Sequence, residues 1–385
     1  MKTSFTIFLL AVLIIFNNPL PAQVSFEVYV SSRGTNAVKK YDMNGGYLGD
    51  FVTSGSGGLS NTEDILFHPD GSVLVTGFGN SSVKRYDGST GDYLGDFSSG
   101  YTLASPSKMS IGPDSLIYVT QWGTTQNKVV RFTLEGEFHD EFTSIGAPKG
   151  LGHVWDEQKN FYIALFGTGG SGTIHKFDSL GNDLGTFINS TVIQGPTSIW
   201  FDGDGSMLVE DWTLGKVFRY DEDGEYLEEF ISGMTSPEGI AITPDGKLLI
   251  GDWGQDAVHL FTTDGESLGY FTTGNGLLDP NSVKIKPVAL TGMNEFSEEQ
   301  LSLQVFPTAG SGKFNIELEN SHPEHIRIRI IDMQGRIIDD LTDRKVGPGF
   351  HQITWKPSAE IEKGTFIIQV QTGGTMLTKR IMVIR

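Results

Sequence analysis

The 385-residue sequence contains no cysteine. This absence excludes disulfides, cysteine nucleophiles and thiolate metal sites. Basic residues are scarce, because 28 Lys and Arg stand against 47 Asp and Glu, which gives a net charge of −19. Residues 294–385 hold 11 basic and 12 acidic residues, so nearly all of the acidic excess lies before them. Such a surface repels phosphate groups, and we expect neither nucleic acid nor an anionic membrane as a partner.

Long apolar runs are also rare. The N-terminal run, Phe5–Phe16, follows Lys2 and precedes the helix-breaking segment Asn17–Pro21 and the small residue Ala22. This order predicts a secretory signal peptide over residues 1–22. The run is too short to cross a bilayer comfortably, so the sequence predicts no transmembrane segment in the mature protein.

The common catalytic signatures are absent as well. The chain has no Gly-x-Ser-x-Gly elbow, no phosphate-binding loop ending in Gly-Lys-Ser/Thr and no His-Glu-x-x-His motif. The sequence therefore identifies no catalytic residue, and a protein without enzymatic activity is the first hypothesis.

A turn motif that usually carries an aromatic residue recurs six times, at steps of 45, 44, 44, 46 and 41 residues. Its central residues are Arg33, Phe78, Trp122, Phe166, Trp212 and Trp253. Each copy precedes a short apolar run, a turn such as Asp-Gly and a further short strand pattern, and none shows helical periodicity. A repeat of this period built from strands predicts an all-β fold with a six-bladed β-propeller.

The two ends of the repeat region are complementary. The chain begins with three strand patterns, Phe26–Val30, Ala37–Tyr41 and Tyr47–Phe51, and lacks the first strand of a blade. An unpartnered first strand, Ser282–Lys286, stands at the far end. Pairing these segments would close the ring without a disulfide, so we expect the propeller to span residues 24–287.

The C-terminal part of the chain is a separate object. After a linker over residues 288–297, residues 298–385 contain seven short strand patterns with polar turns between them. The patterns are Leu301–Phe306, Phe314–Leu318, Ile326–Asp332, Arg336–Ile338, Phe350–Trp355, Thr365–Val370 and Leu377–Val383. They predict a small β-sandwich domain.

Both parts resemble known families. The stretches SVKRYDGSTGDYLGDF from Ser82 and SPEGIAITPDGKLLIGDWGQDAV from Ser236 resemble NHL-like and gluconolactonase-like six-bladed propellers of secreted bacterial proteins. IRIIDMQGRII from Ile328 and the closing TKRIMVIR from Thr378 resemble the C-terminal sorting domain of type IX secretion substrates. That resemblance implies handling by the type IX machinery and a secreted or cell-surface protein.

One set of polar residues is predicted to meet at the channel mouth. Aligning the blades on their prolines gives one residue per blade: Glu63, Ser107, Lys149, Thr197, Glu238 and Asn281. Glu63, Glu238 and Asn281 come from consecutive blades once the ring closes, and they would suit calcium or another divalent cation. The gluconolactonase resemblance implies a catalytic metal at such a site. Alternatives are a pairing of Lys149 with one carboxylate, or channel polarity without a metal.

The aromatic turn residues Phe78, Trp122, Phe166, Trp212 and Trp253 are predicted on the same face, with Arg33 in the sixth position. Such a ring could stack on sugars or clamp a peptide. The alternative is that each aromatic packs between neighbouring blades.

Three functions follow from these observations. The first is a secreted or cell-surface binding module for a glycan or a peptide. The second is a divalent-metal-dependent, lactonase-like hydrolase that uses Glu63, Glu238 and Asn281. The third is a structural or adhesive surface protein.

Overall fold

The computed structural model describes residues 25–189, 192–288, 301–310, 312–320, 324–332, 336–347, 349–358, 361, 363–372 and 376–384. The predicted signal peptide lies outside the described residues, as does most of the predicted linker. Internal contacts separate one compact unit, Ser25–Val288, from the C-terminal part of the chain.

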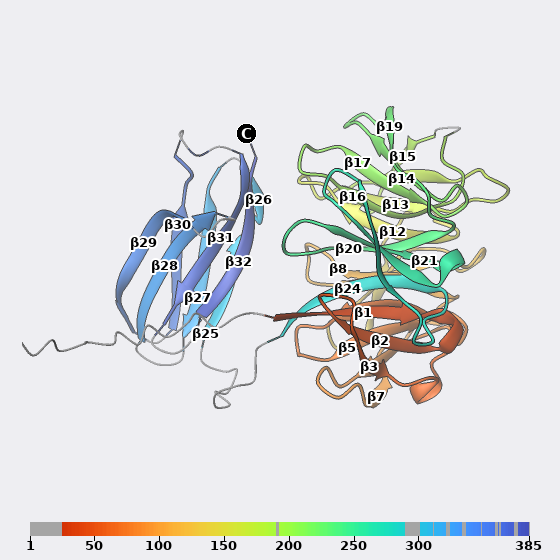
Figure 1. Cartoon of the computed structure of the whole chain (residues 1–385), viewed down its shortest axis with the longest axis horizontal. Coiled ribbons are helices and arrows are strands. Elements are labelled where there is room, and N and C mark those ends of the chain that lie inside the picture. The colour runs from red at the N-terminus through yellow and green to blue at the C-terminus, as the bar shows by residue number, and fades with distance from the viewer. Residues whose placement is uncertain are drawn as a thin grey trace, which may run out of the picture. The chain divides into compact units, whose positions relative to one another are not determined.

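The first unit consists of six four-stranded antiparallel sheets, as the repeat predicted (Figure 1). The first strands are β24 (Pro280–Val288), β4 (Thr62–Phe67), β8 (Pro106–Ile111), β12 (Gly150–Trp155), β16 (Pro196–Phe201) and β20 (Pro237–Ile242). First strands of successive blades contact one another around the whole ring, so they form the wall of the central channel. The six-bladed propeller is thereby confirmed.

The remaining strands of each blade follow outward in chain order. The second strands are β1 (Ser25–Ser32), β5 (Val73–Gly77), β9 (Ile117–Gln121), β13 (Phe161–Leu165), β17 (Met207–Asp211) and β21 (Leu248–Asp252). The third strands are β2 (Ala37–Asp42), β6 (Ser82–Tyr86), β10 (Val130–Phe132), β14 (Thr173–Phe177), β18 (Lys216–Tyr220) and β22 (Ala257–Phe261). The fourth strands are β3 (Tyr47–Val52), β7 (Tyr93–Asp96), β11 (Phe138–Glu141), β15 (Asp183–Ile188), β19 (Tyr226–Ile231) and β23 (Ser267–Thr273).

The closing blade combines strands from both ends of the propeller. β1 pairs antiparallel with β24, with Val28 opposite Ile285 and Tyr29 opposite Lys284. The predicted closure is therefore present, and the inner edge of β1 is covered by the last propeller strand (Figure 1).

The aromatic residues at or next to the ends of the third strands belong to the core between blades. Tyr41, Tyr86, Phe132, Phe177, Tyr220 and Phe261 are all buried. Burying a side chain of this size is worth roughly 1.5–3 kcal/mol. Each of the six hydrophobic clusters of the propeller contains one of these aromatic residues.

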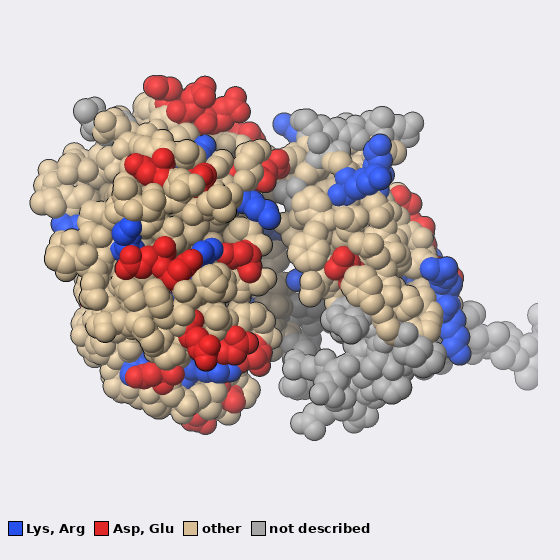
Figure 2. Space-filling model, turned by 180° about the vertical axis from the view of Figure 1, so that it is seen from behind, with Lys and Arg blue, Asp and Glu red and all other residues tan. Residues whose placement is uncertain are grey.

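Acidic side chains gather on the outside of the propeller, and Figure 2 shows several patches of them on the face in view. The turn between β18 and β19, for example, carries Asp221, Glu222, Asp223 and Glu225. The surface therefore favours neutral or basic ligands over anions.

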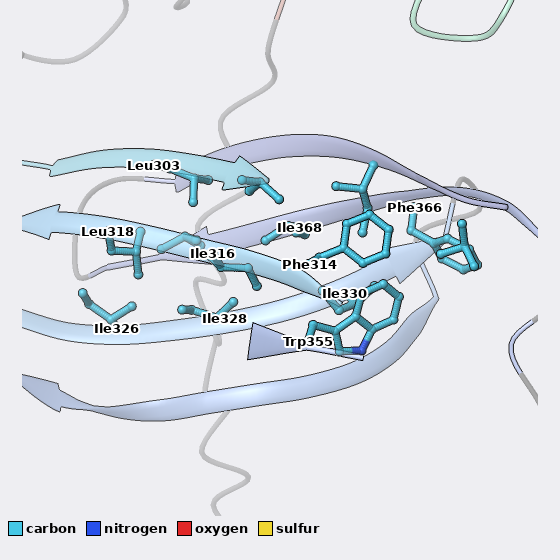
Figure 3. Close-up of a cluster of buried hydrophobic side chains, with 14 residues drawn as sticks. Leu303, Phe314, Ile316, Leu318, Ile326, Ile328, Ile330, Trp355, Phe366 and Ile368 are labelled. Atoms are coloured by element: carbon cyan, nitrogen blue, oxygen red, sulfur yellow. The ribbon is translucent and has the colours of Figure 1, made fainter. Parts of the chain in front are cut away.

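The C-terminal part forms two sheets that face each other. Its strands are β25 (Leu301–Phe306), β26 (Ala309–Gly310), β27 (Phe314–Asn320), β28 (Glu324–Asp332), β29 (Ile337–Val346), β30 (Gly349–Trp355), β31 (Gly364–Gln371) and β32 (Met376–Val383). One sheet has the order β25-β27-β30 and the other β26-β32-β31-β28-β29. Phe314, Trp355, Ile328 and Ile368 are buried between them (Figure 3). The β-sandwich is as predicted.

β29 is longer than the predicted strand Arg336–Ile338. Its extension carries Asp339, Asp340 and Asp343, which are poor strand formers. Asp340 accepts a hydrogen bond from Arg327 on β28 at 2.6 Å. Such cross-strand charge pairs stabilise a sheet, but the residue preferences of the segment alone do not predict a strand there. In the described part of the chain, no helix has the length and apolarity needed to cross a membrane.

Candidate functional site

The six turn residues of the repeat form a closed ring, which we call the aromatic collar. Its members are Phe78, Trp122, Phe166, Trp212 and Trp253, together with Arg33. Ring centroids are 6.3 Å apart for Phe78–Trp122, 5.1 Å for Trp122–Phe166, 6.0 Å for Phe166–Trp212 and 5.9 Å for Trp212–Trp253. The guanidinium of Arg33 completes the circle at 4.3 Å from the Phe78 ring and 5.1 Å from the Trp253 ring. Every member is half-buried, so the collar packs on itself and still offers surface to solvent.

Backbone hydrogen bonds hold the collar in place. In each blade the N–H of the collar residue donates to a carbonyl just before the first strand of the same blade. Trp212, for example, donates to Gly195 at 2.9 Å, and Trp253 donates to Ser236 at 3.0 Å. Asp211, which precedes Trp212, accepts a further N–H from Gly195 at 3.1 Å. The backbone therefore has the same hydrogen bond at each collar position, whereas the side chain at that position varies among the blades.

Arg33 joins the collar to a buried charge cluster, which consists of Arg33, Glu63, Lys108, Glu238 and Asn281. Arg33 pairs with Glu63. The ammonium of Lys108 lies 2.6 Å from a carboxylate oxygen of Glu238 and 3.4 Å from one of Glu63. Asn281 donates its amide to Glu63 at 2.8 Å, and its backbone carbonyl accepts from Lys108 at 2.8 Å. The structure thus brings together Glu63, Glu238 and Asn281, and it adds a lysine between them.

The charges of this cluster depend on one another. Burial alone would raise the pKa of Glu63, but Lys108 and Arg33 outweigh it and the pKa is lowered. Burial raises the pKa of Glu238 to about 8, with Lys108 opposing the rise and Glu63 adding to it. Burial would lower the pKa of Lys108, but Glu238 and Glu63 outweigh that effect and the pKa is raised. Lys108 is therefore a charged ammonium at neutral pH.

These residues do not fit a divalent cation as they lie. The ammonium of Lys108 already stands between the two carboxylates, at the place a metal would need. The side-chain amide nitrogen of Asn281 faces Glu63, so this group donates where a metal ligand would accept. Among the residues that the structure describes, no group of three or more His, Cys, Asp or Glu could hold a metal. A metal would have to displace a buried ion pair.

We therefore expect excess calcium to leave the thermal melting temperature of the protein unchanged relative to chelator. A cation that binds the native state must raise its stability by mass action. Melting followed by circular dichroism in calcium and in chelator measures this directly. The double variant Glu63→Gln/Glu238→Gln is the control. A rise of several degrees that disappears in this variant would contradict our reading of the cluster.

Lys149 does not take part in the cluster. Gly150 pairs with Leu165, the last residue of β13, just as Pro106 in the preceding blade pairs with Gln121, the last residue of β9. Gly150 is therefore the structural equivalent of Pro106. Leu151 therefore occupies the channel position, and the alignment on Pro148 is two residues out of register. Lys149 instead donates to the carbonyl of Gly167 at 2.8 Å and lies 5.6 Å from the Trp122 ring.

Sequence reasoning missed Lys108, which directly follows the channel position Ser107. The ladder between β8 and β9 shifts register between Pro106 and Met109. In a regular strand consecutive side chains point to opposite faces, but such a bulge lets two consecutive side chains point to the same side. The same shift recurs at this point in β4, β12, β16 and β20. A repeated irregularity of the inner strands therefore sets which side chains enter the channel.

Next to the cluster the inner strands line a half-open cavity of about 160 Å³, and Lys108 and Asn281 of the cluster form part of its wall. Asp64 lines it and accepts hydrogen bonds from the Met109 N–H at 2.7 Å and the Ser282 hydroxyl at 2.6 Å. Lys284 lies 3.3 Å from the same carboxylate. Burial opposes ionisation of Asp64, but Lys284 and Lys108 prevail and its pKa is lowered. The cavity is therefore polar and contains fixed charges of both signs.

The sheets define a six-bladed β-propeller and a β-sandwich. Two solved structures are similar to this chain over about two thirds of its length. The nidogen/laminin complex contains a chain with a TM-score of 0.56 and 12% identity, covering 70% of this chain and 100% of that chain. A Bacteroides caccae protein of unknown function has a TM-score of 0.54 and 15% identity, covering 67% and 98%. At these identities the likeness shows the fold alone.

A structure described as a gluconolactonase aligns with a TM-score of 0.46 and 15% identity, covering 66% of this chain and 84% of that chain. Residues 304–384 match the family model described as a secretion system C-terminal sorting domain. This domain indicates export by the type IX secretion system and a secreted or cell-surface protein. No curated protein sequence matches the chain.

Proposed function

We propose that this protein is an exported binding module that takes a glycan or a peptide on its aromatic collar. The sorting domain delivers the propeller outside the cell, and the mature protein is then either released or attached to the surface. The single observation that carries the proposal is the collar itself, a closed and half-exposed ring of five aromatic side chains and one arginine.

Several properties of the collar support a binding role. Large aromatic surfaces supply contact energy at small entropic cost, and they stack on sugar rings as well as on peptide side chains. The backbone frame holds the rings before a ligand arrives, which lowers the cost of ordering them on binding. The acidic exterior of the propeller favours an uncharged glycan or a basic peptide over anionic ligands.

The metal-dependent hydrolase remains an alternative without a specific observation in its favour. Its three ligand residues lie together, but Lys108 neutralises the carboxylates on which the metal would depend. A structural or adhesive role is the outcome that remains if neither sugars nor peptides bind.

Replacing Trp212 with alanine is expected to weaken binding by about 10- to 30-fold, because truncating a central aromatic contact costs about 1.4–2 kcal/mol. Arrays of neutral glycans and basic peptides would first identify the ligand, and calorimetry would then compare the variants. Tyr226→Ala provides the matched control, because Tyr226 is an exposed aromatic residue on the outer strand of the same blade. Equal binding by Trp212→Ala and the unaltered protein would refute the collar as the ligand site.

A further inference from the structure

A serine and a histidine face each other across two inner strands. Ser110 on β8 and His153 on β12 place the serine hydroxyl oxygen 2.5 Å from Nε2 of the imidazole. Nδ1 of the same ring lies 3.3 Å from the carbonyl oxygen of Leu151. Both side chains are half-buried and line the cavity of the channel.

His153 is unusual for its position in the blade. In each blade one residue of the first strand pairs with a central residue of the second strand. In this blade that residue is His153, which pairs with Ile163 of β13. The other five blades place Ile65, Met109, Ile199, Ile240 and Val283 there. A packing role alone is met by an aliphatic side chain at this site, so the histidine needs another explanation.

The two contacts of His153 select one form of the ring. Nδ1 carries the proton and donates to Leu151, which leaves the lone pair of Nε2 to accept the hydroxyl proton of Ser110. Burial lowers the pKa of His153 to about 4, while the Leu151 contact and Asp64 oppose the shift. At neutral pH the imidazole is therefore uncharged and its Nε2 lone pair is available, although a pKa of about 4 makes it a weaker base than a free imidazole. A nucleophile, a base and a group that orients the base are the three parts of an activated hydroxyl.

The cavity also supplies a cation. Lys284 is 35% exposed and lies 3.3 Å from Asp64, which leaves its ammonium free to donate to a further oxygen. Asp64 also accepts the N–H of Met109, the residue before Ser110, so one carboxylate positions both the cation and the serine strand. Ser110 is three strand residues beyond the level of Ser107, or roughly 10 Å along the channel. The dyad is thus separate from the carboxylates of the charge cluster.

We propose that Ser110 and His153 form an acyl-transfer site for a small carboxylic ester. The oxygen of Ser110 attacks the carbonyl carbon while its proton passes to Nε2 of His153. Lys284 stabilises the negative charge that develops on the carbonyl oxygen. The adduct collapses by breaking the bond to the alcohol oxygen, which takes the proton from His153 and leaves an acyl-serine. Water, deprotonated by His153, then releases the acid and restores the serine.

A fluorophosphonate probe tests this site, because it phosphonylates an activated serine and releases fluoride. Intact mass and peptide mapping of the purified protein are expected to show one adduct, on Ser110. Ser110→Ala should lose the adduct, and His153→Gln should slow its formation by about 100-fold or more. Ser198→Ala, which changes another serine of the same cavity, should label at the normal rate.

Thermal melts of each variant separate loss of chemistry from loss of folding. The small ester p-nitrophenyl acetate should compete with the probe and release nitrophenolate from the unaltered protein but not from Ser110→Ala. Absence of an adduct on Ser110 in the folded protein would overturn the proposal. Labelling that is equally fast in a folded His153→Gln variant would do the same, and the pair would then be a structural hydrogen bond.

Discussion

Replacing Lys108 with methionine is expected to lower the free energy of unfolding of the propeller by about 3–5 kcal/mol. Methionine keeps much of the length of lysine but removes the charge. Glu63 and Glu238, whose side chains are 3% and 5% exposed, would then lose the ammonium that lies between them. Of these two residues Arg33 pairs with Glu63 alone, so Glu238 would be left without a cation. Its pKa, which burial already raises to about 8, would then rise further.

Denaturant unfolding of the protein and the variant measures this difference, with near-ultraviolet circular dichroism to follow tertiary structure. Lys40→Met is the matched control, because Lys40 also pairs with a glutamate, Glu27, at 3.3 Å but near the surface. Such exposed pairs contribute at most about 1 kcal/mol. Adding Glu238→Gln to Lys108→Met should restore part of the stability. If Lys108→Met lowers the free energy of unfolding no more than Lys40→Met does, the charge of Lys108 does not stabilise the cluster.

Replacing Glu210 with glutamine is expected to stabilise the protein by about 3 kcal/mol above pH 7 and by almost nothing at pH 4.5. Glu210 on β17 is fully buried, and among the described residues neither carboxylate oxygen has a partner in normal hydrogen-bond geometry. At the same blade position, Thr76 and Thr120 use their hydroxyls to accept inner-strand N–H groups at 2.7 and 2.9 Å. Glu210 therefore lacks the hydrogen bond to an inner-strand N–H that Thr76 and Thr120 make at this position.

The sign of the pH dependence follows from the proton affinity of the folded state. Burial raises the pKa of Glu210 from 4.5 to about 7, although Ser198, Lys108 and Gly239 offset part of the rise. The folded protein then holds this proton more tightly than the unfolded chain does, so Glu210 weakens the fold as pH rises from 4.5 to 7. Glutamine does not titrate and escapes this loss.

Denaturant titrations at several pH values from 5 to 8 would show the difference between Glu210→Gln and the unaltered protein. The same substitution at Glu222, in an exposed turn, controls for a general effect of removing one acidic charge. A gain that stays constant across this range would mean that the carboxyl of Glu210 does not titrate there, and the proposed cause would be incorrect.

The repeat made the fold predictable from sequence. Three features recur at nearly fixed spacing: a turn residue, a buried aromatic such as Tyr41 or Tyr86, and an Asp-Gly turn. The strands assigned in one blade therefore predict the strands of the others. The closing pair of β1 and β24 followed from counting strands, because a missing strand at one end matched a spare one at the other.

The sites were less predictable, because they depend on register and on contacts between blades. The identities of Glu63, Glu238 and Asn281 followed from one residue per blade, but Lys108 enters beside them through a bulge that leaves no sequence mark. Ser110 follows the blade position that His153 occupies in the next blade, so the two residues do not align in the repeat although their side chains meet. No fixed spacing in the sequence encodes such a pair.

The pairing of β1 with β24 also has a consequence for the order of folding. It joins Ser25 to Val288, the largest sequence separation available in the propeller, so closing the ring requires nearly the whole domain. Contacts of such high order form slowly, since the loop entropy is lost before the pairing compensates for it. Until β24 arrives, the first blade to leave the ribosome has three strands and an uncovered edge, which is the state most exposed to mispairing.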